Sequence, residues 1–276
     1  MNALEIHGLT KRRGDFLLQG LELTLPAGCI MGLIGENGAG KSTTIRLILN
    51  ALSRDGGTVA VYGKDNRALT PLEREDIGAV LDEVGLPEYM TARQIGRMMA
   101  GIFARWQPEV YRGYLRRLAL PEDKPFRDFS RGMKMKLGLA AALSHQPKLL
   151  LLDEATSGLD PVVRDDILTI LSDFTRNEEH AVLISSHIVS DLEKVCDYIA
   201  FLHRGRLLLC EEKDRLTEEY GILRGTTEGI EPAAVCGQRA TPYGTEYLVR
   251  RSAVPAGVPL GQVNIEDLFV FMAKEA

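Results

Sequence analysis

Short apolar runs along the chain predict its strands. Residues 21–25 alternate apolar and polar side chains, which is typical of a strand with one face in solvent. Residues 29–34 form an apolar run, and similar short runs recur at 149–152, 181–184 and 198–202. Such runs are typical of strands buried on both faces. Because helical stretches separate them, we expect an α/β protein whose mainly parallel sheet is covered by helices on both faces.

Helix signals fill much of the sequence between these strands. Residues 91–120, 130–144 and 162–175 have helical patterns with capping residues or proline at their starts. Pro108 is expected to begin a second helix within the first of these stretches. The first two stretches lie between strand blocks, so we predict a helical insertion at about residues 86–146 of the α/β core.

The residue pattern of the chain changes near residue 215. Glycines and prolines recur beyond this point and separate short strand-like pieces such as residues 246–250, whereas residues 265–272 have helical periodicity. We therefore predict a main domain over residues 1–215 and a small α+β appendage over residues 216–276. The appendage is either a regulatory or dimer-stabilising element or only a structural cover.

Composition excludes several broad classes of protein. The 276 residues are 45% hydrophobic and 26% charged, with 27 Gly and 12 Pro, which is typical of a globular protein and not of a disordered, collagenous or coiled-coil one. The formal net charge of −5 creates no overall field that would attract nucleic acid or anionic lipid. Binding of either would need a local basic patch, and we expect no nucleic-acid partner.

Cysteine spacing and hydropathy indicate a reducing compartment. Four cysteines are scattered without the CxxC spacing of a zinc site, so we expect reduced packing residues. Basic residues 11–13 precede any apolar run long enough for a signal peptide, and no stretch approaches the ~18 apolar residues of a membrane span. We therefore expect a cytoplasmic chain.

A phosphate-binding motif follows the buried strand at 29–34. Gly35–Ser42 matches GxxxxGK[ST], and a helical stretch follows it. In such a loop backbone N–H groups cradle phosphates, Lys41 reaches the β- and γ-phosphates, and the Ser42 hydroxyl can ligate Mg²⁺. The alternative is a glycine-rich turn into a helix. Phosphate binding is assigned to Glu36, Asn37, Gly38, Ala39, Gly40, Lys41, Ser42 and Thr43.

Two carboxylates end a second buried strand. Asp153 and Glu154 follow the apolar run 149–152, at the sheet edge where ligands bind in open α/β folds. Asp153 is expected to hold Mg²⁺ through water, and Glu154 to orient or deprotonate the water that attacks the γ-phosphate. The alternative is a strand that simply enters a polar loop.

Further motifs then follow in a fixed order. Phe129–Met133 starts a helix before the acids, Ser157–Asp160 follows them, and His187 comes after the run 181–184. With the phosphate loop, these residues resemble the ATP-binding subunits of ABC transporters, over about residues 3–212. The resemblance implies a P-loop NTPase of the ABC ATPase type, which hydrolyses ATP with Mg²⁺ and combines a mainly parallel sheet, an antiparallel β subdomain and a helical insertion.

The resemblance also implies a dimer that encloses the nucleotide. Ser130 and Gly132 would close over the γ-phosphate held by the opposite protomer, Asp160 would lie in the D-loop between them, and His187 would contact the γ-phosphate. Ser130 could instead be only a helix cap, and His187 an ordinary packed or exposed histidine. The implied partners are a second copy or a homologous ATPase subunit, and separate permease chains at the inner face of the cell membrane.

Five positions depart from the family pattern: Arg13, Asp82, Arg131, Met133 and Ala155. Asp82 stands where a Gln normally faces Mg²⁺, and it is either a metal ligand or a solvated loop acid. Arg131 replaces the first glycine of the signature. Arg13 occupies the place of the adenine-stacking aromatic residue, and Arg13 or Phe16 could stack on the base instead.

The pattern around Arg131 and the form of the tail resemble bacterial exporter ATPases of the Ytr and bacitracin-transporter kind. The transported substrate would then depend on the permease. A non-transport ABC-type ATPase that acts as an assembly or regulatory factor is the alternative. A P-loop kinase would leave Ser130, Asp160 and His187 unexplained.

Overall fold

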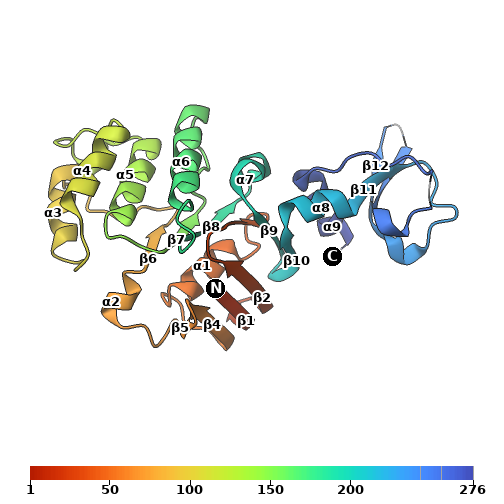
Figure 1. Cartoon of the computed structure of the whole chain (residues 1–276), viewed down its shortest axis with the longest axis horizontal. Coiled ribbons are helices and arrows are strands. Elements are labelled where there is room, and N and C mark those ends of the chain that lie inside the picture. Colours follow the sequence, from red (N-terminus) through yellow and green to blue (C-terminus); the bar gives the residue numbers. More distant parts are fainter. Residues whose placement is uncertain (243, 256, 276) are drawn as a thin grey trace.

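The computed structural model describes residues 1–242, 244–255 and 257–275. Its centre is a six-stranded sheet of order β10-β9-β3-β8-β7-β6 (Figure 1). Neighbouring strands are parallel except β9 and β10, which form an antiparallel hairpin, so the expectation of a mainly parallel sheet is confirmed. The strands are β3 (Ile30–Ile34), β6 (Ile77–Val80), β7 (Leu149–Asp153), β8 (Ala181–Ser186), β9 (Tyr198–His203) and β10 (Arg206–Glu212).

Strand register places the candidate residues at one edge of this sheet. Ile34 pairs with Ser186 across β3 and β8, and Asp153 pairs with Ser185 across β7 and β8. Because parallel strands end at the same edge, the loop after β3 and the acids that end β7 lie side by side there.

A second, antiparallel sheet of order β2-β1-β4-β5 packs against one face of the central sheet. It forms the expected antiparallel subdomain, and the helix α1 (Lys41–Ile48) lies with it on this face. Its core is built from the buried leucines and isoleucines of the first two strands. The strands are β1 (Asn2–Arg13), β2 (Phe16–Pro26), β4 (Gly56–Val61) and β5 (Lys64–Asp65).

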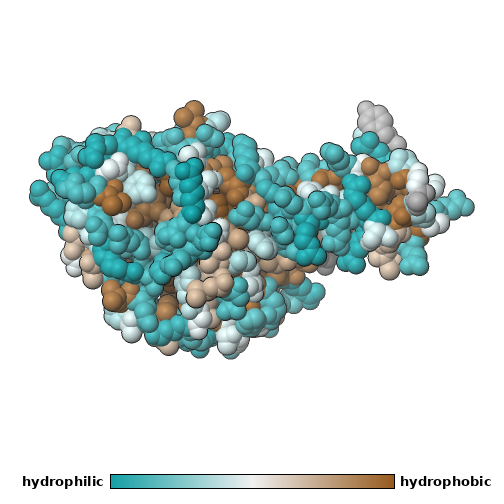
Figure 2. Space-filling model, viewed as in Figure 1, coloured by the Kyte–Doolittle hydropathy of each residue, from teal (hydrophilic) through white to brown (hydrophobic). Residues whose placement is uncertain are grey.

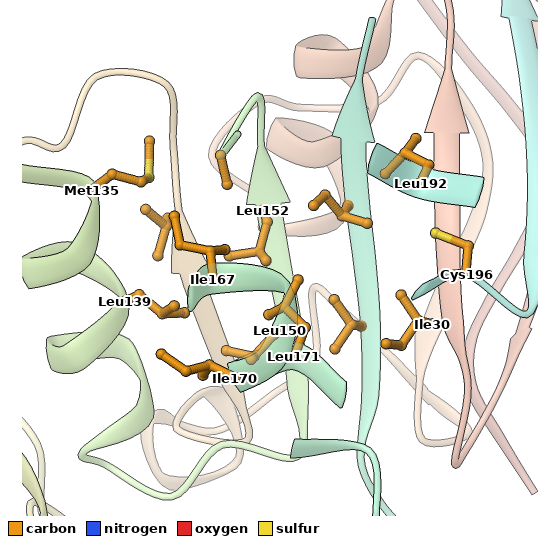
Figure 3. Close-up of a cluster of buried hydrophobic side chains, with 14 of the residues drawn as sticks. Ile30, Met135, Leu139, Leu150, Leu152, Ile167, Ile170, Leu171, Leu192 and Cys196 are labelled. Carbon is orange, nitrogen blue, oxygen red and sulfur yellow. The ribbon is translucent and has the colours of Figure 1, made fainter. Parts of the chain in front are cut away.

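Helices α6 (Pro161–Phe174) and α7 (Val189–Val195) cover the opposite face. Ile167, Ile170 and Leu171 of α6 pack against Leu150 and Leu152 of β7 (Figure 3). Burying side chains of this size contributes about 1.5–3 kcal/mol each relative to exposure, so this layer fixes the strand that carries the two acids.

The helical insertion contains α3 (Ala92–Ala100), α4 (Pro108–Arg117) and α5 (Arg131–Leu143). The stretch 91–120 is therefore two helices, and the second begins at Pro108 as expected. Thr91 caps α3 in a capping box with Gln94, which satisfies two backbone donors. Within the insertion a 3-10 turn (Phe126–Asp128) precedes α5, and the short helix α2 (Pro71–Arg74) lies before the insertion in the chain, between β5 and β6. No helix of the described residues is long and apolar enough to cross a membrane.

The C-terminal part stands beyond β10 at one end of the molecule (Figure 1). Its three-stranded antiparallel sheet has the order β11-β13-β12, and the last helix returns towards α7. The N–H of Ile265 donates to Glu193 Oε1 of α7 at 2.7 Å, and the rings of Phe269 and Phe201 meet edge to face at 5.3 Å. The elements are α8 (Lys213–Glu219), β11 (Tyr220–Arg224), β12 (Val235–Thr241), β13 (Gly244–Arg250), α9 (Ile265–Glu275) and the 3-10 turns Pro232–Ala234 and Arg251–Ala253.

Candidate nucleotide-binding and catalytic site

The phosphate loop joins β3 to α1 and requires glycine at two crowded positions. A Cβ on Gly35 would lie 2.3 Å from the carbonyl oxygen of Leu202. Gly40 has φ +115°, and a Cβ there would lie 2.8 Å from Phe16 Cζ. A side chain at either position would therefore push the loop away from β9 or from the ring of Phe16.

A cavity of about 720 Å³ opens over this loop. Most of the residues assigned from sequence to nucleotide binding line it, and Gly14, which the sequence had not singled out as a binding residue, lines it as well. Ala39 is buried, and its N–H donates to Glu36 O at 3.1 Å. The lining residues are Arg13, Gly14, Phe16, Glu36, Asn37, Gly38, Gly40, Lys41, Ser42, Thr43, Asp82 and Glu154.

The carboxylate of Glu154 lies between the side chains of Lys41 and His187. Its Oε1 lies 3.0 Å from Lys41 Nζ, and its Oε2 lies 2.7 Å from His187 Nδ1. Lys41 also donates to the carbonyl of Gly35 at 2.7 Å. Glu154 has φ +53°, an uncommon conformation for a residue with a side chain and one that is often found at functional sites. The structure thus brings together Lys41, Glu154 and His187, which are far apart in sequence.

Ser185 supports both acids from the neighbouring strand. Its fully buried hydroxyl donates to Asp153 Oδ1 at 2.7 Å and accepts the N–H of Glu154 at 3.0 Å. Sequence reasoning missed this residue. A hydroxyl at the end of the apolar run 181–184, next to the strand of the acids, was the available signal.

A second missed residue supports the phosphate loop. His203, at the end of β9, places Nδ1 2.9 Å from Glu36 Oε2. The ring is buried, and its Nε2 has no hydrogen-bond partner in the described part of the chain. Because the backbone carbonyl of Glu36 accepts a hydrogen bond from Lys41 at 3.2 Å, His203 braces the same loop that orients the lysine.

Two of the residues that depart from the family motifs, Asp82 and Arg131, contact each other. Arg131 Nη2 donates to Asp82 Oδ1 at 2.9 Å. The guanidinium also lies against Gly158, where a Cβ would be 3.2 Å from Arg131 Nη1. Asp82 lines the cavity, so its carboxylate faces the nucleotide site while it is paired with the start of α5.

Six candidate residues do not line the cavity of their own chain. Ala39, Asp153 and His187 adjoin or contact residues that line it, whereas Ser130, Gly132 and Asp160 lie at two helix starts. Ser130 Oγ accepts the N–H of Met133 at 3.3 Å and caps α5, and Asp160 Oδ1 accepts the N–H of Val163 at 3.0 Å and caps α6. Gly132 faces Val163 across these two helix starts. Both helix N-termini are therefore grouped together but apart from the phosphate loop.

The donor set at the cavity suits Mg²⁺ bound together with a nucleotide. Among the described residues, no group of three or more His, Cys, Asp and Glu side chains could hold a metal ion alone. Mg²⁺ needs no such cage, because it commonly binds one or two protein oxygens, water and substrate phosphates. Ser42 supplies a hydroxyl in the cavity and Asp153 a carboxylate beside it, while the buried Glu154 Oε1 has only the ion pair with Lys41 among the described residues.

Comparisons with known proteins agree with this geometry. The model of the ABC transporter family matches residues 18–157. The ABC transporter ATP-binding protein YhcH of Bacillus subtilis is 32% identical, with 93% of this chain and 87% of that protein covered. The bacitracin transport ATP-binding protein BcrA of Enterococcus faecalis is also 32% identical, with 82% and 73% covered. The lantibiotic transport ATP-binding protein SrtF of Streptococcus pyogenes is 31% identical, with 76% and 91% covered.

Solved structures show the same fold. A structure of an ATP-binding subunit of an ABC transporter superposes with a TM-score of 0.71 at 26% identity and covers 78% of this chain and 92% of its own. CbiO1 of Clostridium perfringens, part of the ABC transporter complex CbiONQ, gives a TM-score of 0.67 at 24% identity over 79% and 91% of the two chains. The chain therefore belongs to the ABC transporter family and is one of its ATP-binding, ATP-hydrolysing subunits.

Proposed function

We propose that this chain drives an exporter by hydrolysing MgATP in a dimer that docks on a separate membrane permease. The observation that carries the proposal is the placement of Glu154 beside Lys41 and His187, at the cavity over the phosphate loop. The names of BcrA and SrtF, which refer to bacitracin and lantibiotic transport, support a role in export.

The nucleotide would lie along the cavity with its phosphates on the loop. Backbone N–H groups and Lys41 bind the phosphates, and Arg13 or Phe16 stacks on the base. Ser42 and Asp153 would hold Mg²⁺, with Asp82 as a further ligand, and the ion would neutralise phosphate charge. Lys41 exchanges Glu154 for phosphate oxygens, and this exchange frees Glu154 to orient the attacking water.

Ser130, Gly132 and Asp160 serve the partner protomer in this proposal. They lie outside the cavity of their own chain, at the grouped N-termini of α5 and α6. Positive helix ends of this kind bind anionic oxygens, so a second copy or a homologous subunit would receive them over its γ-phosphate. His187 would turn from Glu154 to the same phosphate as the dimer closes.

The permease would dock on the helical insertion, at the cytoplasmic face of the membrane. Tyr89 and Ile102 are exposed large hydrophobic residues there, whereas Ile95 and Trp106 belong to the core. We assign residues 1–215 to the ATPase domain and residues 216–276 to an accessory region that packs on α7 and β9 through α9.

The test compares wild type with Glu154→Gln, each with MgATP, by size exclusion and phosphate release. The variant should lose hydrolysis and accumulate a dimer, because the amide cannot deprotonate water but fills the same space. Glu179→Gln, on the surface, is the matched control. Hydrolysis by Glu154→Gln at the wild-type rate would overturn the assigned role, and inactive monomers of both proteins would indicate dependence on the permease.

A further inference from the structure

Helices α3 and α4 enclose a groove on the helical insertion, away from the nucleotide cavity. They approach closely because Gly96 has no side chain: a Cβ there would lie 2.6 Å from Tyr111 Cε1. Tyr111 also donates to the carbonyl of Ala92 at 2.9 Å. The groove has a volume of about 590 Å³, and the largely buried Trp106 and Tyr111 form its apolar floor. Over this part of the molecule, apolar residues are framed by hydrophilic ones (Figure 2).

Four arginines form the walls of the groove. Arg93 and Arg97 lie on α3, and Arg112 and Arg116 lie on α4. Within each pair the spacing of four residues places both side chains on one helix face. All four are exposed, so their charges are available to a ligand.

This concentration of positive charge contrasts with the rest of the chain. Residues 86–146 contain 11 Lys and Arg against 5 Asp and Glu, whereas the whole chain contains 33 against 38. The insertion is therefore basic although the protein is acidic. Unpaired like charges on adjacent helices repel each other, so an anionic ligand would stabilise this arrangement.

Carboxylates of the chain itself already pair with two of the four arginines. Arg93 pairs with Glu122 at 3.3 Å and with Asp123 at 3.1 Å, and Arg112 pairs with Glu109. No carboxylate of residues 1–242, 244–255 or 257–275 is within ion-pairing distance of Arg97 or Arg116. Carboxylates of the chain thus pair with one groove arginine on each helix, and the second groove arginine of each helix, Arg97 or Arg116, has no carboxylate partner among the described residues.

We propose that this groove binds an acidic helical segment of a protein partner, through carboxylates on Arg97 and Arg116 and an apolar side chain on the floor at Trp106. The planar fork of arginine matches a carboxylate with two hydrogen bonds. An apolar floor between charged walls suits a peptide that carries both kinds of side chain, and a flat headgroup layer would not fill it. That the partner is a permease rests on the proposed function. The preference for an acidic segment with an apolar side chain rests only on the residues of the groove.

The full chain provides its own probe for the experiment, because Trp106 is its only tryptophan. A synthetic helical peptide with two glutamates four residues apart and a leucine between them is titrated while Trp106 fluorescence is recorded. We expect a saturable change that weakens as salt is added. Arg97→Glu combined with Arg116→Glu should weaken binding at least about tenfold, because two attractions become repulsions.

Arg46→Glu combined with Lys194→Glu is the matched control, since it makes the same charge change at exposed residues outside the groove. The double variant Arg97→Gln with Arg116→Gln removes both charges without adding repulsion. Thermal unfolding of every variant shows whether lost binding reflects lost folding. Absence of saturable binding, or equal weakening in the control, would overturn the proposal. Binding of vesicles that contain anionic phospholipid but not of the peptide would replace it with a lipid site. ATP hydrolysis, measured on the same samples, tests the proposed function separately.

Discussion

Asp82 and Arg131 form an ion pair of 2.9 Å between the loop after β6 and the start of α5. Each residue replaces an uncharged residue of the family motifs. The opposite charge of each partner offsets the electrostatic cost of placing the other charge there. Both side chains are about half exposed, at 52% and 53%, so the pair contributes only about 0.2–1 kcal/mol to stability. Such a weak contact can be exchanged for Mg²⁺ or phosphate when a nucleotide binds.

The first prediction concerns this exchange. Asp82→Asn should raise the Mg²⁺ concentration for half-maximal hydrolysis about tenfold, because an amide is a poorer ligand than a carboxylate. Arg131→Gln breaks the same ion pair but keeps the carboxylate, so it should leave the Mg²⁺ requirement unchanged or lower it. Titrations of phosphate release against Mg²⁺ check both variants. Equal shifts in the two variants would assign the effect to the ion pair and remove Asp82 from the metal site.

Ser185 should be needed for both stability and hydrolysis. Ser185→Ala removes the donor to Asp153 and the acceptor for the Glu154 N–H, and should cost about 1–3 kcal/mol of unfolding free energy. It should also lower the rate of ATP hydrolysis per folded molecule. Ser144→Ala is the control: its buried hydroxyl donates to Ala140 O at 2.6 Å, far from the acids. If both variants hydrolyse ATP alike, Ser185 is only structural.

Sequence alone predicted the parts of the site that are contiguous or that end strands. The phosphate loop and the pair Asp153 and Glu154 are of this kind, since topology brings strand ends together without side-chain detail. The bond between His203 and Glu36 joins residues 167 positions apart, and no local pattern signals it. Likewise, the periodicity of residues 265–272 predicts a helix, but its packing on α7 and β9 depends on tertiary contacts such as Ile265 with Glu193 and Phe269 with Phe201.

His203 should affect nucleotide binding more than the chemical step. His203→Leu releases Glu36 and should raise KM for ATP about fivefold, which corresponds to the ~1 kcal/mol of one hydrogen bond, with a smaller change in kcat. His203→Asn can place an amide nitrogen near the Nδ1 position and should restore most of the affinity. Steady-state kinetics of the two variants provide the measurement. Failure of Asn to improve on Leu would mean that ring packing, and not the hydrogen bond, matters.

The C-terminal helix should stabilise the central sheet through its contact with β9. Phe269→Ala removes the edge-to-face contact with Phe201 and should lower the free energy of unfolding by about 1–3 kcal/mol, because Phe269 is only partly buried. Urea unfolding measures this free energy. Basal ATP hydrolysis of the folded variant then shows whether residues 216–276 regulate the enzyme or only cover its surface. Unchanged hydrolysis per folded molecule would favour a structural cover. A changed rate would favour regulation, since β9 also carries His203, which contacts Glu36 of the phosphate loop.

His145 should make the protein less stable in mild acid. Its ring is buried, stacks on Phe103 at 4.2 Å, and places Nδ1 3.1 Å from the carbonyl oxygen of Glu75. Burial lowers the pKa of His145 below its ordinary 6.5; Arg105 acts in the same direction, and the Glu75 carboxylate opposes it. The unfolded chain therefore binds a proton at higher pH than the folded one, so stability falls as pH drops from about 6.5 towards the folded pKa.

The slope of this loss is at most about 1.4 kcal/mol per pH unit for one group. His145→Asn can keep a donor to the Glu75 carbonyl but cannot titrate, so its unfolding free energy should depend less on pH in this window, even if the variant is less stable throughout. His7→Asn is the control, because His7 is exposed and pairs with Glu22 on the surface. Urea unfolding above and below pH 6.5 measures the slopes. Equal slopes for His145→Asn and wild type would show that other groups cause the acid sensitivity.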